Sequence, residues 1–108
     1  MDIRSEAARA RDGVVPGSLH LPRTVLEWRA DPTSEWRNPH VGGFERRIVV
    51  LCDHGYSSSL AAAALVELGF RDVADVVGGF EAWVVAGLPV SRAAPARDGL
   101  PGMGSPDA

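Results

Sequence analysis

One segment constrains the fold of this 108-residue chain more than any other. Residues 47–51 (Arg-Ile-Val-Val-Leu) form a short, β-branched, uninterrupted run, which predicts a strand buried on both faces of a parallel sheet. Cys52 closes this strand, and a helix is expected over residues 57–68, with Gly69 at its left-handed C-terminal cap. A second strand is predicted at residues 73–77. Strand, helix and strand in this order imply right-handed crossovers, so the segment predicts an α/β fold with a mostly parallel sheet.

Shorter elements are expected on either side of this segment. Residues 2–4 resemble the end of a strand, and Ser5 is expected to cap a helix over residues 6–11. In chain order, the further expectations are a turn at 16–18, a strand at 19–21, a helix at 24–29, a loop at 35–44 and a helix at 79–86. We therefore expect one domain over residues 1–91. The Ala-, Pro- and Gly-rich residues 92–108 are expected to be a disordered tail.

The composition argues against several classes of function. The net charge is −3, and every basic residue is an arginine outside any basic run, so no nucleic-acid or membrane partner is expected. No stretch approaches the roughly 18 apolar residues of a membrane span, and the first residues lack the pattern of a signal peptide. A single cysteine fits a reducing cytoplasm. His20, His40 and Cys52 show no metal-ligand spacing, so no metal and no cofactor are expected.

The loop after Cys52 carries the predicted chemistry. It joins the carboxyl end of a strand to the start of a helix, where ligands bind in open α/β sheets. Gly55 allows a tight curl that points N–H groups inward, and the helix adds the positive end of its dipole. Such a cradle favours a thiolate and would hold a persulfide, although a buried structural cysteine is the alternative reading. The residues expected to form this cradle are Asp53, His54, Gly55, Tyr56, Ser57 and Ser58.

Three separated segments resemble the rhodanese family. The first is Asp-Ile-Arg at residues 2–4 with Val-Pro-Gly-Ser at 15–18. The second is the strand ending at Cys52 with its loop, and the third is Gly-Gly-Phe-Glu-Ala-Trp at 78–83 with Gly-Leu-Pro-Val at 87–90. The resemblance implies a three-layer α/β/α domain. The family normally has a strand–helix segment before the position of Met1, so the first strand is expected to be shortened.

The resemblance also implies a sulfurtransferase. Cys52 would take sulfane sulfur from thiosulfate or a persulfide donor and pass it to a thiol or cyanide acceptor, including a protein thiol. The alternative is a non-catalytic module that carries the persulfide or binds a protein. A cysteine phosphatase on this fold needs an arginine at the sixth position after the nucleophile, where this chain has Ser58.

Two residues of the loop depart from the family pattern. Ser57 stands where an arginine is common, and Asp53 stands where a basic residue is common. The Asp53 carboxylate is expected to repel both the thiolate and thiosulfate, which favours a less charged donor or the carrier alternative. His54 is read either as a proton donor or as a solvated loop residue, and Tyr56 either flanks the pocket or packs on the loop.

Residues outside the loop are given structural roles. Trp83 is expected in the core. Trp28 and Trp36 are expected either to pack over one face of the sheet or to rim the pocket, and core packing is the favoured alternative. Asp2 and Arg4 are expected to be structural anchors, with Arg4 able to reach toward the Cys52 loop.

Overall fold

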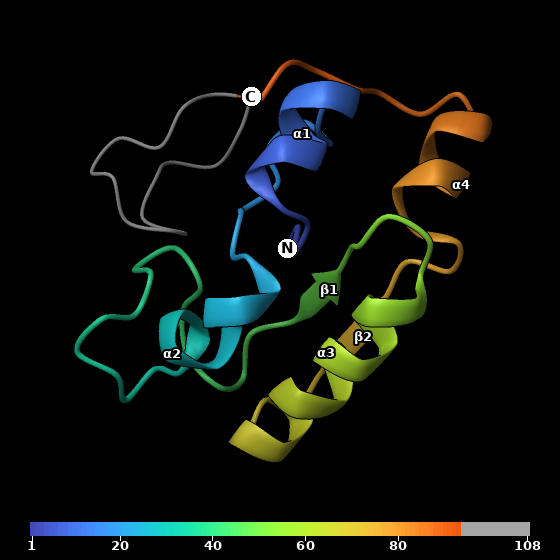
Figure 1. The fold of residues 1–108 in the computed structure, drawn as a ribbon. Helices are drawn as coiled ribbons and strands as arrows, with labels where there is room; N and C mark the ends of the chain where they lie inside the picture. Colours follow the sequence, from blue (N-terminus) through green and yellow to red (C-terminus); the bar gives the residue numbers. More distant parts are fainter. Residues whose placement is uncertain (94–108) are drawn as a thin grey trace.

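The computed structural model describes residues 1–93, and its centre is a parallel pair of strands (Figure 1). These strands are β1 (Ile48–Val50) and β2 (Val73–Asp75), and they pair in register from Ile48 opposite Val73 onward. Asp2 extends the sheet by a parallel bridge to Leu51, and a second parallel bridge joins Asp2 to His20. The predicted α/β fold with a parallel sheet is confirmed. The strands expected at 2–4 and 19–21 contribute one bridged residue each.

The helices follow the predicted order with small differences in their ends. The described residues contain α1 (Glu6–Asp12), a 3₁₀ turn (Arg23–Val25), α2 (Leu26–Ala30), α3 (Tyr56–Leu68) and α4 (Gly79–Val85). Ser5 caps α1 as expected, because its hydroxyl accepts the N–H of Ala8 at 3.1 Å. The tail expected at residues 92–108 lies outside the described residues from position 94 onward. In the part of the chain that is described, no helix has the length and apolar character needed to cross a membrane.

The core lies between one face of the sheet and the helices α2 and α3. Ile48 and Val50 point into it and are buried, whereas Val49 between them is 41% exposed. The prediction that this strand is buried on both faces is therefore wrong. The second face is covered only in part, by residues 15–18 and Trp83, which line a shallow groove over Val49.

The prediction that the three tryptophans lie in the core is also wrong. Helix α2 buries Leu26, Arg29 and Ala30, so its single inward stripe leaves Trp28 on the outer side. Trp28 packs instead on Trp36, with ring centroids 5.8 Å apart, and the two side chains are 42% and 52% exposed. Trp83 is half-buried, and its indole N–H donates to the carbonyl oxygen of Pro89 at 2.7 Å.

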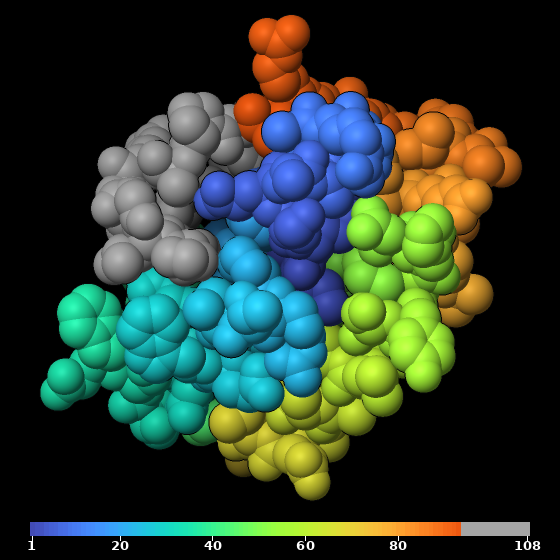
Figure 2. Space-filling model, viewed as in Figure 1, coloured from blue at the N-terminus to red at the C-terminus, as the bar shows by residue number. Residues whose placement is uncertain are grey.

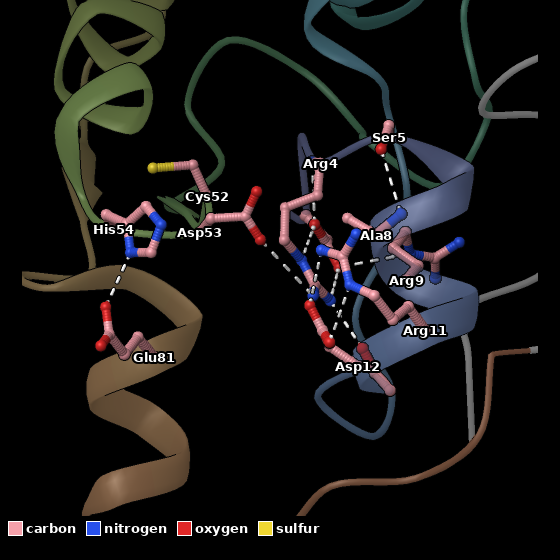
Figure 3. A network of polar contacts seen from close by, with 12 residues as sticks. Arg4, Ser5, Ala8, Arg9, Arg11, Asp12, Cys52, Asp53, His54 and Glu81 are labelled. Carbon is pink, nitrogen blue, oxygen red and sulfur yellow. Dashed lines mark hydrogen bonds and ion pairs between the residues drawn. The ribbon is translucent and has the colours of Figure 1, made fainter.

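A buried ionic cluster anchors the N-terminal segment, as expected for Asp2 and Arg4. The Asp2 carboxylate accepts hydrogen bonds from Nε and one terminal nitrogen of Arg4, at 3.1 and 2.8 Å. Arg9 of α1 donates to the same carboxylate through Nε at 3.2 Å. Burial raises the pKa of Asp2, but these guanidinium contacts outweigh burial and hold the pKa below its ordinary value. Figure 3 shows the two arginines reaching into this network from α1 and the segment before it.

The cluster predicts a stability defect for Asp2→Asn. Removing the carboxylate takes away the negative charge that the two buried guanidinium groups share, so we expect a loss of about 3 kcal/mol in the free energy of unfolding. The matched control is Asp72→Asn, which breaks an exposed pair with Arg47 and should change stability little. Urea unfolding measures both; equal stability of the two variants would contradict the assignment.

The same cluster predicts how this defect depends on pH. Because the folded pKa of Asp2 is lowered, its contribution is fully present above pH 3.8, the ordinary pKa of the carboxyl. The contribution is lost as the pH falls through the folded pKa. The stability difference between the wild type and Asp2→Asn should therefore shrink in acid.

Candidate active site at Cys52

Cys52 lies at the end of the central strand with its sulfur held by the loop that follows. Its Sγ accepts the N–H of Gly55 at 3.0 Å and the N–H of Ser58 at 3.3 Å. The side chain is only 6% exposed. The loop returns on itself because Gly55 adopts φ 89°, a left-handed conformation that other residues rarely take. The curl expected from the sequence is therefore present, with N–H groups directed at the sulfur.

The start of α4 clamps this loop from the other side. The N–H of Phe80 donates to the carbonyl oxygen of Cys52 at 2.8 Å, and the N–H of Glu81 donates to that of Asp53 at 3.1 Å. The chains approach so closely that a Cβ on Gly79 would lie 2.5 Å from the Cys52 carbonyl oxygen. A Cβ on Gly55 would lie 2.7 Å from the nitrogen of Gly78. The two glycines before Phe80 thus belong to the site, a role the sequence analysis did not assign to them.

The surroundings of the thiol favour its charged form. Burial raises the pKa of Cys52. Hydrogen bonds from the hydroxyl and N–H of Ser58, and from the N–H groups of Gly55 and His54, outweigh burial and lower the pKa below its ordinary value. A cysteine with a lowered pKa is a better nucleophile near neutral pH, because the thiolate is the reactive species.

Contrary to the expectation from the sequence, the Asp53 carboxylate does not face the sulfur. In Figure 3 the Cys52 sulfur and the Asp53 carboxylate point to opposite sides of the loop. The carboxylate turns toward Arg4, with 3.9 Å between its Oδ1 and a guanidinium nitrogen. Arg4 thus reaches the loop as expected, and its positive charge offsets the negative charge that Asp53 brings close to the thiolate.

The remaining loop side chains divide into one that has a partner and two that face solvent. His54 is largely exposed but not isolated, since its Nδ1 lies 2.7 Å from Oε2 of Glu81 on α4. Tyr56 is 77% exposed at the first turn of α3, and Ser57 is also exposed. No sequence pattern predicted the contact between His54 and Glu81, which lie 27 residues apart in the chain.

Ser58 connects Cys52 to a second carboxylate that the sequence analysis missed. Its side chain is fully buried, and its hydroxyl donates to Oδ2 of Asp75 at 3.2 Å. The same hydroxyl also contributes to lowering the pKa of Cys52. A hydroxyl has one hydrogen, so Asp75 and the thiolate compete for it. Asp75, at the end of β2, therefore sets how strongly Ser58 can stabilise the thiolate. Within residues 1–93, no three side chains among His, Cys, Asp and Glu come together as a metal site.

Comparison with known proteins decides the family. The family model of the rhodanese-like domain matches residues 1–86. This chain belongs to that family. Among solved structures, a rhodanese-like domain from an Anabaena protein is 28% identical with a TM-score of 0.67, and the match covers 83% of this chain and 93% of that one. A protein of unknown function from Rhodopseudomonas palustris, described as a possible tyrosine phosphatase, is 38% identical with a TM-score of 0.76 over 83% of this chain and 67% of that chain.

Two curated relatives of this rhodanese-like chain are named thiosulfate sulfurtransferase. GlpE from Actinobacillus succinogenes is 48% identical over 50 residues, which is 46% of this chain and 45% of that protein. GlpE from Vibrio cholerae is 51% identical over 47 residues, or 44% of each chain. The chain therefore spans a little under half the length of the curated relatives it matches.

The competition for the Ser58 hydroxyl predicts opposite effects of two substitutions. Ser58→Ala removes the contribution of the hydroxyl and keeps that of the backbone N–H at position 58, so the pKa of Cys52 should rise. Thiolate-specific alkylation at neutral pH should slow by roughly tenfold, the value of one hydrogen bond to a charged group. Asp75→Asn replaces the competing carboxylate with a neutral and therefore weaker acceptor, so the hydroxyl hydrogen is more available to the sulfur and alkylation should accelerate.

The measurement is the rate of iodoacetamide alkylation as a function of pH. Ser59→Ala is the matched control, because the Ser59 hydroxyl donates to the carbonyl oxygen of Tyr56 rather than to the sulfur. Slower alkylation of Asp75→Asn would rule out the competition.

Proposed function

We propose that this chain is a sulfurtransferase that carries sulfane sulfur as a persulfide on Cys52. The observation that supports this most directly is the pair of N–H groups, from Gly55 and Ser58, aimed at a sulfur whose pKa is lowered. Membership of the rhodanese-like family and similarity to proteins named thiosulfate sulfurtransferase support the same reaction class. The thiol must stay reduced to react, so we propose a reducing compartment such as the cytoplasm.

The proposed reaction has two displacements. The Cys52 thiolate attacks the outer sulfur of the donor and forms an S–S bond, while the donor's own bond to that sulfur breaks. With thiosulfate as donor, sulfite leaves with the electron pair. A thiol or cyanide acceptor then attacks the outer sulfur of the persulfide, and Cys52 leaves as the thiolate. The N–H groups of the loop are suited to stabilise negative charge in both steps, as an oxyanion hole does for oxygen.

The charges around the loop favour a donor less anionic than thiosulfate. Ser57 offers no cation to grip a sulfonate group, and the positive charge of Arg4 is already shared with Asp2 and Asp53. We therefore propose that a persulfide, of a small molecule or of a protein, is the better donor. A module that only relays sulfur to a partner protein is the alternative, and steady-state turnover with cyanide as acceptor separates the two.

A phosphatase reading has less support. The Rhodopseudomonas palustris structure is described as a possible tyrosine phosphatase, but that description concerns that protein. In this chain the sixth residue after the cysteine is Ser58, whose buried hydroxyl binds Asp75 and offers no bidentate grip on a phosphate. We propose no phosphatase activity, and p-nitrophenyl phosphate hydrolysis checks this in the same assay series.

The persulfide can be tested by intact mass. Incubation with thiosulfate or an inorganic polysulfide should add one sulfur atom to the wild type and none to Cys52→Ser. His40→Asn, an exposed histidine outside the loop, is the control and should load like the wild type. A wild-type protein that stays unmodified with every donor would exclude the enzyme and leave the binding module.

The charge deficit predicts a gain of function for Ser57→Arg. A guanidinium at this exposed position would supply the bidentate contact to an anionic donor, so kcat/KM for thiosulfate should rise roughly five- to tenfold. Use of an uncharged persulfide donor should not change. Ser59→Arg is the matched control, because positions 57 and 59 point to opposite sides of α3. An equal gain in both variants would indicate a general charge effect on the surface.

A further inference from the structure

The carboxylate of Asp75 lies one residue away from the Cys52 sulfur, with Ser58 between them. Asp75 is half-buried at the end of β2, on which α3 packs (Figure 1). Its Oδ2 accepts a hydrogen bond from the hydroxyl of Ser58 at 3.2 Å, and within residues 1–93 no arginine or histidine pairs with it. Asp53, by contrast, lies 3.9 Å from Arg4. Asp75 therefore acts on its surroundings through the Ser58 hydroxyl, with no cation to offset its charge.

Ser58 contacts the sulfur as well as this carboxylate. Its N–H donates to Sγ of Cys52 at 3.3 Å, and its hydroxyl helps to lower the pKa of Cys52. The side chain is fully buried, and a hydroxyl has one hydrogen that rotates about the C–O bond. The hydrogen turns toward the acceptor that carries more negative charge, so its direction depends on the charge of the sulfur.

Sulfur transfer changes the charge on Sγ, whereas the carboxylate of Asp75 takes no part in the reaction. Before a donor is attacked, and again when Cys52 leaves, the negative charge lies on Sγ. In the persulfide, Sγ is a neutral sulfur bonded to Cβ and to the outer sulfur, and the charge lies on the outer sulfur. A neutral sulfur is a weak acceptor, so the hydroxyl of Ser58 then binds Asp75 without competition.

We propose that Asp75 is a positioning residue that acts through Ser58 and favours the persulfide-loaded state of Cys52 over the sulfur-free state. The inference rests on the proposed function, because it concerns the two displacements of sulfur transfer. Asp75 draws the hydroxyl hydrogen away from the free thiolate, which makes that thiolate less stable and a stronger nucleophile. The same effect makes Cys52 a poorer leaving group when an acceptor attacks the persulfide. Asp75 thus speeds loading and slows discharge, so that sulfur stays longer on the protein.

The two displacements balance without a proton from Ser58. In loading, an electron pair of Sγ forms a bond to one sulfur of inorganic polysulfide, and the rest of the polysulfide leaves with the electrons of the broken S–S bond. In discharge, the carbon of cyanide attacks the outer sulfur, and the bond from that sulfur to Sγ breaks. Its electron pair stays on Sγ, and thiocyanate is released. The hydroxyl hydrogen changes only its acceptor.

The test is to measure loading and discharge separately on the full chain. Polysulfide loads Cys52, the donor is removed, and cyanide then discharges it, with intact mass as the readout of each rate. Both rates are taken at the pH where loading reaches its plateau, so that all Cys52 is thiolate and only its intrinsic reactivity differs. One hydrogen bond to a charged group changes thiolate stability by about tenfold, and about half of that change, on a logarithmic scale, appears in the rate of attack.

The two half-reactions should therefore respond in opposite directions. Asp75→Asn should load about threefold more slowly and discharge about threefold faster than the wild type, because its neutral amide holds the hydroxyl less strongly. Ser58→Ala should load faster and discharge more slowly, because it has no hydroxyl to stabilise the thiolate. A loss of structure in either variant would slow both half-reactions, so the opposite shifts are specific to the proposed role.

Two controls and a double variant complete the experiment. Asp72→Asn removes a carboxylate just before β2 that pairs with Arg47, and Ser59→Ala removes a hydroxyl that donates to the carbonyl oxygen of Tyr56. Both should load and discharge like the wild type. In a Ser58→Ala background, Asp75→Asn should have no further effect on either rate, since the hydroxyl through which Asp75 acts is gone.

The outcomes separate this inference from the proposed function. Failure of wild-type Cys52 to load with sulfur would overturn the proposed function itself. Normal loading, together with unchanged rates in Asp75→Asn or rates that both move in the same direction, would overturn the role of Asp75 alone. An effect of Asp75→Asn that persists in the Ser58→Ala background would show that its charge acts directly on the sulfur, which contradicts the path through Ser58.

Discussion

The guanidinium of Arg4 joins the N-terminal segment and the end of α1 to the Cys52 loop and to α4. It donates to the Asp2 carboxylate at 2.8 Å and to the carbonyl oxygen of Gly13, just after α1, at 2.8 Å. It stacks 4.0 Å from the ring centroid of Phe80 on α4 and lies 3.9 Å from Asp53 in the Cys52 loop. A buried charge destabilises the fold unless its partners stay in place, so the positions of these segments depend on one another. In Figure 2 the dark blue N-terminal residues lie at the centre of the face, between α1 and the green start of α3.

Groups of opposite effect around the Cys52 sulfur determine how stable its thiolate is. The N–H groups of Gly55 and Ser58 favour a negative charge on Cys52. Two carboxylates oppose that charge, and each is diverted: Asp53 toward Arg4 and Asp75 toward the Ser58 hydroxyl. The balance gives a thiolate that is stabilised without being surrounded by cations. This distribution is the basis of our proposal that a persulfide is a better donor than a strongly anionic one.

Local sequence predicted the parts of the site that are contiguous in the chain. The β-branched run, the cysteine, Gly55 and the Ala-rich helix follow one another, so their geometry depends on neighbouring residues. Glu81 and Asp75 were missed because they meet His54 and Ser58 across 27 and 17 residues, through the packing of α4 and β2. Trp28 was misplaced because α2 is only five residues long and has room for one buried stripe. Hydrophobicity identified such residues as candidates for the core, but helix phase decided where they lie.

The close contact between the Cys52 loop and the glycines before Phe80 limits how a protein of this design can diversify. Two hydrogen bonds from the first turn of α4 hold the loop carbonyls, and Gly55 and Gly79 leave no space for a Cβ. An inserted residue between Gly55 and Ser58 would change how their N–H groups are directed at the sulfur. The side chains at positions 53, 54, 56 and 57 can be exchanged without this cost to the backbone. The side chains that a substrate would meet can therefore change while the backbone conformation of the loop stays the same.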